Sequence, residues 1–143
     1  MEIIETKTAT NSMLEKDILL VVMKENAVVD VPEAKENYEA TIQLTGGKKF
    51  AALIDGRNYA TVTDEAKKYA AQPEIMKNTI GHAIVINSLA SRLIVNFLLK
   101  FHNKDKNVAM KLFTDYDAAL NWVREKLKEE ENSKQKKLIG GTV

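Results

Sequence analysis

Hydrophobic residues fall into short blocks along the chain, and their spacing predicts strands separated by helices. Residues 2–10 alternate in polarity, whereas residues 18–24 and 48–55 carry apolar runs. Alternation is typical of a strand with one buried face, and the unbroken run within 48–55 suits a strand buried on both faces. Residues 83–87 and 107–113 have the same character. The pattern therefore predicts five strands.

Polar capping residues mark where helices begin between these strands. Asp30 precedes a proline and an early glutamate, which is a favourable N-cap arrangement, and Gly46-Gly47 suit a left-handed C-cap. Thr63 or Asp64 begins a second helix, and a short helix is predicted over 74–79. These segments alternate with the strands.

Two further segments have apolar positions at helical spacing. Residues 89–101 carry apolar side chains on more than one face of the predicted helix. One face would cover the sheet, and the other apolar side chains would contact another helix, a second subunit or a lipid-like ligand. Core packing is the default interpretation, and a homodimer is the sharper hypothesis. The last helix begins at the capping-box sequence Thr114–Asp117 and has an apolar face as far as Leu127.

The element order β-β-α-β-α-β-α-β-α predicts an α/β fold with a mixed sheet of four to five strands covered by about four helices. A chain of 143 residues suits one domain. After Leu127 nearly every residue as far as Lys137 is polar or charged. We therefore expect a single domain over 1–128 and a charged, flexible C-terminal tail over 129–143.

The composition is that of an ordinary globular protein and narrows the function classes. Hydrophobic residues make up 45% of the chain, charged residues 29%, and the formal net charge is +1. Because acidic and basic residues nearly balance, no strong positive electrostatic potential is expected that would attract nucleic acid. No nucleic-acid partner is therefore predicted. The absence of cysteine fits a reducing cytoplasm, and no apolar stretch suits a signal peptide or a transmembrane segment.

No motif for a cofactor, a metal ion or a catalytic group is recognised. The histidines, His82 and His102, lie on different predicted elements, and a metal site needs three or four convergent ligands. Gly46-Gly47 lack the Gly-Lys-Ser/Thr of a phosphate loop, and no serine lies in a Gly-x-Ser-x-Gly turn. The sequence therefore predicts no cofactor, no metal and no catalytic residue.

Arginine is scarce, and two of the three arginines follow predicted strands. Arg57 comes after the strand 48–55, and Arg92 lies one helical turn beyond the strand 83–87. Ligands and partners of α/β proteins usually bind at this end of the strands, and arginine offers a rigid fork of donors. Arg57 and Asn58 could thus form a recognition spot beside Thr63.

Each arginine also has a purely structural interpretation. Arg57 can pair with Asp55, Asp64 or Glu65 while Asn58 forms an Asx turn, and this interpretation is favoured over recognition. Arg92 can bind an anion near Ser88 and Ser91, or it can extend from a packed helix to pair with an acid. For Arg92 both alternatives stay open.

The element order and six stretches resemble the STAS-like (SpoIIAA-like) family, and in particular its small uncharacterised bacterial members. The stretches are DVPEAKEN (30–37), LIDGRN (53–58), TDEAKKY (63–69), SRLIVNF (91–97), KLFTD (111–115) and DAALNW (117–122). As a set they are moderately specific and span most of the chain. The resemblance implies a four- or five-stranded sheet with helices packed on it.

The resemblance also implies a regulatory role, with one departure. The better-known anti-sigma-factor antagonists of this fold carry a phosphorylatable serine, in an Asp-Ser-Ser-Gly-like motif, where a helix begins. Here Asp55 matches the strand-ending aspartate, and Asp64 falls about where the phosphoserine would be, with Thr63 beside it. Thr63 stays open as a phosphoacceptor, although the acids Asp64 and Glu65 would repel an added phosphate.

The sequence thus predicts a cytoplasmic, non-catalytic protein-interaction or regulatory module that forms homo-oligomers. Its protein partner would contact six residues: Arg57, Asn58, Thr63, Asp64, Ser91 and Arg92. The alternative is a binder of a small apolar or lipid-like ligand, held between the helix 89–101 and the sheet. An enzyme comes third, because no cluster of titratable residues is evident.

Overall fold

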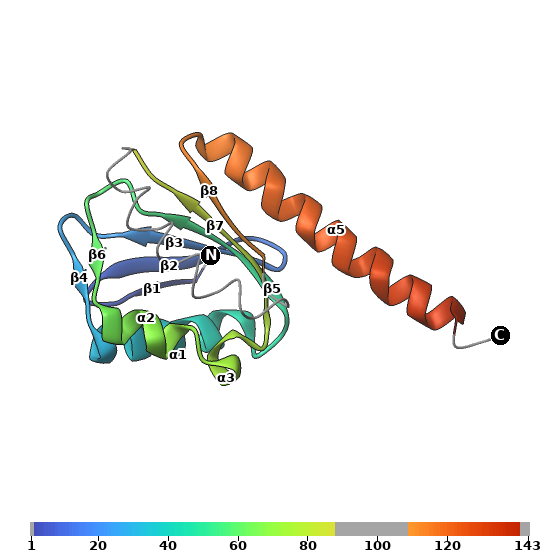
Figure 1. Cartoon of the computed structure of the whole chain (residues 1–143), viewed down its shortest axis with the longest axis horizontal. Helices are drawn as coiled ribbons and strands as arrows, with labels where there is room; N and C mark the ends of the chain where they lie inside the picture. Colours follow the sequence, from blue (N-terminus) through green and yellow to red (C-terminus); the bar gives the residue numbers. More distant parts are fainter. Residues whose placement is uncertain (1, 88–108, 141–143) are drawn as a thin grey trace.

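The computed structural model describes residues 2–87 and 109–140 (Figure 1). Its main sheet has the strand order β1-β2-β3-β5-β7-β8. The first three strands pair antiparallel, and β3, β5, β7 and β8 run parallel to one another. The strands are β1 (Ile3–Glu5), β2 (Ala9–Glu15), β3 (Ile18–Met23), β5 (Phe50–Asp55), β7 (Thr79–Val85) and β8 (Ala109–Phe113).

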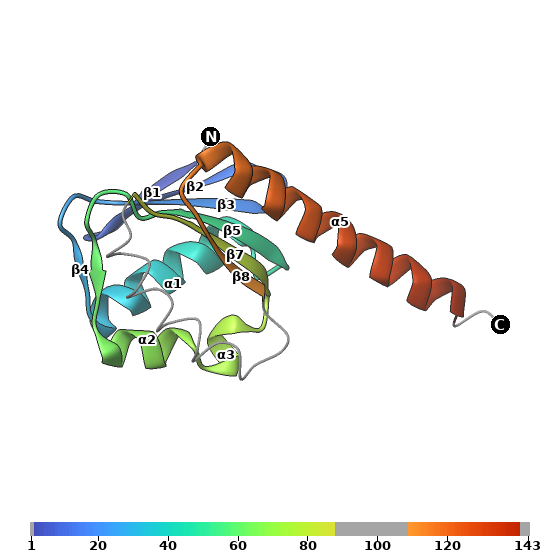
Figure 2. The same cartoon turned by 45° about the horizontal axis from the view of Figure 1, so that its top comes forward.

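Helices cover both faces of this mixed sheet, so the predicted α/β class is confirmed. Figure 2 shows helices beneath the sheet and a long helix above it. The lower helices are α1 (Val31–Thr45), α2 (Asp64–Ala70) and α3 (Pro73–Met76), and the upper helix is α5 (Tyr116–Gly140). A two-stranded ribbon of β4 (Val28–Val29) and β6 (Thr61–Val62) stands beside the sheet. The predicted helix 89–101 lies outside the described residues.

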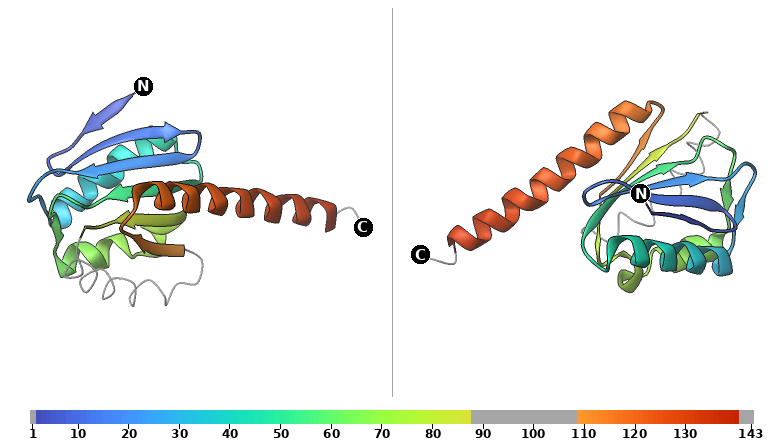
Figure 3. Two further views of the ribbon diagram at one scale, coloured as in Figure 1. Left: turned by 90° about the horizontal axis from the view of Figure 1, so that it is seen from above. Right: turned by 180° about the vertical axis from the view of Figure 1, so that it is seen from behind.

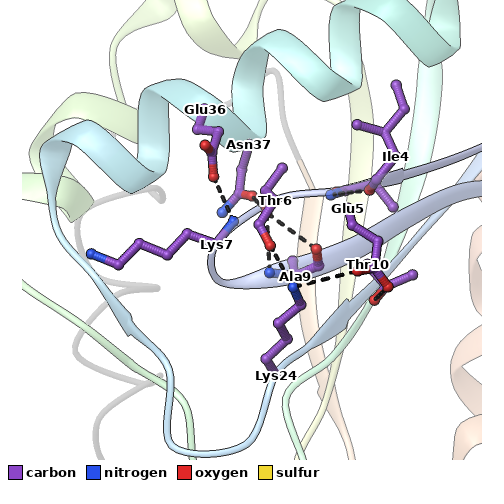
Figure 4. A network of polar contacts seen from close by, with 10 residues as sticks. Ile4, Glu5, Thr6, Lys7, Ala9, Thr10, Lys24, Glu36 and Asn37 are labelled. Atoms are coloured by element: carbon purple, nitrogen blue, oxygen red, sulfur yellow. Dashed lines mark hydrogen bonds and ion pairs between the residues drawn. The ribbon is translucent and has the colours of Figure 1, made fainter.

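The main sheet has six strands, so the predicted number of four to five was too low. The predicted strand 2–10 contains a turn that separates β1 from β2. Figure 4 shows why the chain turns here: the Ala9 amide donates to Thr6 Oγ1 at 3.1 Å, and the Lys7 amide donates to Glu36 Oε1 at 2.6 Å. Asn37 of α1 donates to Thr8 Oγ1 at 2.8 Å. Because the turn contains no glycine or proline, no local sequence signal marks it.

Alternate residues of the central strands pack against different helices. Ala51 and Leu53 of β5 join Val123 of α5 in one buried cluster, whereas Phe50 and Ala52 belong to a cluster on the other face. Side chains of a strand point alternately to its two faces, so an unbroken apolar run fills both layers. This confirms the prediction that the strand within 48–55 is buried on both faces.

Helix α5 is longer than the sequence predicts and projects beyond the sheet (Figure 3). The prediction has it fray after Leu127, whereas the described helix continues to Gly140. Glutamate, lysine and glutamine are good helix formers, and Glu130 also pairs with Lys49 at 2.9 Å. The helix begins one residue later than predicted, because the Ala118 amide donates to Asp115 rather than to a threonine.

Candidate functional site

A cavity of about 340 Å³ lies between the main sheet and helices α1, α2 and α3. Several of the residues that line it are alanines, whose side chains are short. Ala52 comes from β5, Ala34 from α1, and Ala66 and Ala70 from α2. These short side chains leave space that longer apolar residues would fill.

The floor of the cavity is a row of neighbouring residues across four strands. Asn11 pairs with Val21, Val21 with Ile54, and Ile54 with Ile84 in the register of the sheet. All four line the cavity. The floor is therefore apolar over three strands and polar at the β2 end.

Asn11 is fully buried at the polar end of this row. Its Nδ2 donates to the Ile4 carbonyl at 3.2 Å, which fixes the orientation of the amide because the reverse orientation would oppose two acceptors. Its Oδ1 accepts no hydrogen bond from the described residues. Such an unpartnered acceptor costs about 1–3 kcal/mol. Asn11 thus marks a place where a donor from another molecule would be stabilised.

Polar residues of α1 line one wall of the cavity, and several of them are engaged within the chain. Thr41 donates to the Asn37 carbonyl at 3.0 Å, and Asn37 holds the β1–β2 turn (Figure 4). Tyr38 and Tyr69 are half-buried residues of the lining. Burial raises the pKa of Tyr69, and the nearby Tyr38 adds to this effect. The Tyr69 phenol is therefore neutral at physiological pH.

Arg57, the first predicted recognition residue, pairs with Asp55. Its Nε lies 2.9 Å from Asp55 Oδ1 and one terminal nitrogen lies 2.7 Å from Oδ2. The Arg57 guanidinium lowers the pKa of Asp55 chiefly by hydrogen bonding. It also lies over the ring of Tyr116, 5.7 Å from the ring centre. The predicted structural interpretation of Arg57 is confirmed for the Asp55 partner.

The remaining predicted residues at this end of the sheet hold loops and helix ends in place. Asn58 donates to the Met23 carbonyl at 3.1 Å. Thr63 accepts from the Ala66 amide at 3.2 Å and donates to Asp30 Oδ1 at 2.8 Å, so it caps α2 as predicted and ties it to the start of α1.

The predicted site residues divide into three groups. Asp64 is exposed at the start of α2, 3.7 Å from Lys67. The structure places Arg57 and Asn58 in the loop after β5, and Thr63 and Asp64 at the helix start that follows it. Ser91 and Arg92 lie outside the described residues.

Sequence reasoning missed the α1 and β2 residues of the cavity. The alternative hypothesis expected a ligand between the helix 89–101 and the sheet, and the described walls of the cavity come from the sheet and α1–α3. Alanines at 34, 52, 66 and 70 were visible, but a single sequence does not show that they line one cavity.

A sequence model of a protein family matches residues 12–127 of the chain, and its description is "Domain of unknown function (DUF7793)". The chain belongs to this family. The match ends at Leu127, which is also where α5 stops packing against the buried cluster of the sheet. It covers nearly all of the described elements that build the cavity. No curated protein and no solved structure matches the chain.

Two kinds of feature are absent from the part of the chain that the structure describes. Across 2–87 and 109–140, no three acidic or histidine side chains gather as they would around a metal ion. Over the same residues, no helix has the length and the apolar content needed to cross a membrane.

Proposed function

We propose that this protein binds a small apolar ligand in the cavity between the main sheet and α1–α3, without catalysing a reaction on it. The single observation that supports the proposal is the cavity itself, at about 340 Å³ and with mostly apolar walls. Ligand pockets of proteins range from roughly 300 to 1,000 Å³ and are lined in the same way. The volume therefore suits a small molecule.

The physical driving force is the removal of apolar surface from water. Cavities lined by aliphatic side chains bind apolar molecules readily, because the ligand supplies contacts that the walls lack. The preformed helices also reduce the conformational entropy that binding would cost.

Binding of a neutral fluorescent apolar dye, Nile red, tests this proposal. We expect saturable binding of one dye per chain, with the enhanced fluorescence of an apolar environment. Native mass spectrometry of the protein purified from its own host should also show a reproducible added mass of small-molecule size. Absence of both the dye signal and the added mass would refute ligand binding.

A second proposal is that the protein is an interaction or regulatory module. It would have a STAS-like fold and form homo-oligomers in the cytoplasm. It is supported by two exposed apolar side chains near the predicted contact loop: Tyr59 is 65% exposed and Val28 is 56% exposed. Tyr59 also has a positive φ of 59°, a conformation that is strained for a bulky residue and often retained at functional loops.

Native mass spectrometry separates this role from ligand binding alone. We expect the protein from its own host to show a complex that is lost in the variant Tyr59→Ser, because loss of a large aromatic side chain removes a typical contact anchor. Ser12→Ala, on a strand remote from this loop, serves as a control that keeps the complex. An unchanged complex in Tyr59→Ser would exclude the loop as the contact.

A further inference from the structure

A buried hydrogen-bond acceptor lies at one end of the cavity floor. Asn11 of β2 is completely buried and lines the cavity. Its Nδ2 donates to the Ile4 carbonyl at 3.2 Å, whereas its Oδ1 accepts no hydrogen bond. Within 2–87 and 109–140, it is the one buried side-chain oxygen or nitrogen that lacks a hydrogen-bond partner. The polar end of the floor thus offers an acceptor that the described chain does not use.

The neighbouring residues of the lining do not supply the missing donor. Val21 lies beside Asn11 in the register of the sheet, and its side chain has no polar atom. Thr41 of α1 donates to the Asn37 carbonyl at 3.0 Å, and Asn37 donates to Thr8 Oγ1 at 2.8 Å. These two polar side chains of α1 are therefore engaged within the chain. A donor for Asn11 would come from a molecule inside the cavity.

The surroundings of Asn11 also restrict the charge of that molecule. An ammonium group would be buried without a carboxylate, because no aspartate or glutamate is among the described residues that line the cavity. A carboxylate would place its own acceptor oxygens against Asn11 Oδ1, and two acceptors cannot hydrogen-bond each other. A neutral O–H or N–H group avoids both costs.

From this arrangement we infer that the ligand is a neutral molecule with an apolar body and one hydroxyl or amide donor, which donates to Asn11 Oδ1. The apolar body lies along the row Val21–Ile54–Ile84 of the floor. The inference rests on the proposed ligand-binding function and names the class of ligand. Its physical basis is that a buried acceptor is costly to leave unpaired, so a ligand that completes the hydrogen bond gains affinity.

A buried water molecule is the competing donor. Buried waters typically form about three hydrogen bonds to polar groups of the protein. The floor next to Asn11 is apolar at Val21, Ile54 and Ile84, so these residues offer a water no further partner. A ligand with one donor and an apolar body matches this arrangement better than a water molecule does.

Two isomeric ligands, hexanol and pentyl methyl ether, test the inference. They contain the same atoms, but only the alcohol has a hydrogen-bond donor. Each is titrated into the full chain by isothermal calorimetry, together with hexylamine, which is charged at neutral pH. We expect the alcohol to bind more tightly than the ether, because only its hydroxyl completes the Asn11 hydrogen bond. The amine should bind most weakly.

Asn11→Leu should remove the preference for the alcohol, because leucine has a similar size but no acceptor. The ratio of alcohol affinity to ether affinity should fall by about tenfold, which corresponds to about 1.4 kcal/mol. Ser12→Ala is the matched control and should keep the ratio: it removes a polar group from the next residue of β2, which does not line the cavity. If Asn11→Leu does not fold, judged by circular dichroism, Asn11→Val replaces it.

The outcomes separate this inference from the proposed function. A preference for the alcohol that Asn11→Leu abolishes and Ser12→Ala preserves supports the inference. Equal or tighter binding of the ether, tightest binding of the amine, or a ratio that is unchanged in the Asn11 variant overturns it while ligand binding stands. An unchanged ratio is the result expected if a water alone satisfies Asn11.

Failure of all three ligands to bind, while Nile red still binds, also overturns the inference alone. If Nile red fails as well and native mass spectrometry shows no added mass, the proposed function and the inference fall together.

Discussion

Ala52→Leu should abolish Nile red binding and leave the free energy of unfolding within about 1.5 kcal/mol of the wild-type value. Ala52 faces the cavity from β5, so a leucine side chain has space to enter and displaces the dye. The measurement is a dye titration on the folded variant, followed by urea unfolding. Full dye binding by a folded Ala52→Leu variant would show that the dye binds elsewhere.

Ala51→Leu is the matched control, one residue away on the same strand. Ala51 is completely buried on the other face, among Leu53, Val123 and Ala119. Extra volume there has no cavity to enter, so we expect a loss of about 1–3 kcal/mol of unfolding free energy. Dye binding should persist in the fraction that stays folded. Equal losses of stability in the two variants would contradict the different packing of the two faces.

Arg57→Gln should lower the unfolding free energy by about 1–2 kcal/mol at neutral pH, because it leaves the Asp55 carboxylate without its main partner. The Asp55 side chain is only 13% exposed, so water compensates poorly. Arg124→Gln is the control: it breaks a similar two-point pair with Glu15, but both side chains are well exposed. We expect a much smaller loss there.

The pH dependence gives this prediction a definite sign. Arg57 lowers the pKa of Asp55 in the folded protein, so the ionised carboxylate stabilises the fold above its ordinary pKa and this contribution is lost as the pH falls. The difference in unfolding free energy between wild type and Arg57→Gln should therefore have its full value at pH 7 and become smaller below about pH 4. A difference that is unchanged in acid would exclude Asp55 as the cause.

Local signals in the sequence were sufficient for both ends of α1 and for the start of α2. Asp30 caps α1 with Glu33 in reciprocal hydrogen bonds, and Gly46 ends it with a φ of 66°. Thr63 caps α2, and the Asp55 carboxylate pairs with the Arg57 guanidinium. Each of these interactions joins residues close in the sequence, so residue type and spacing predict it.

The features that the sequence did not reveal depend on residues far apart in the chain. The β1–β2 turn is held by Glu36 and Asn37 of α1. The cavity is lined by residues such as Ala34, Ala52 and Ala66, which come from three different elements. The two-residue strands of the β4–β6 ribbon are too short to show any periodicity. Non-local packing decides all three, and one sequence carries no direct record of it.

The projecting half of α5 has a consequence for how the oligomeric state is measured. A helix rises 1.5 Å per residue, so the residues after Leu127 extend the molecule by about 20 Å on one side. Such an elongated particle diffuses more slowly than a sphere of equal mass. The apparent mass read from its elution volume in gel filtration would exceed the true mass of a monomer. A monomer would therefore resemble a dimer in this measurement. Sedimentation equilibrium and light scattering, which report mass without a shape assumption, are therefore the suitable methods.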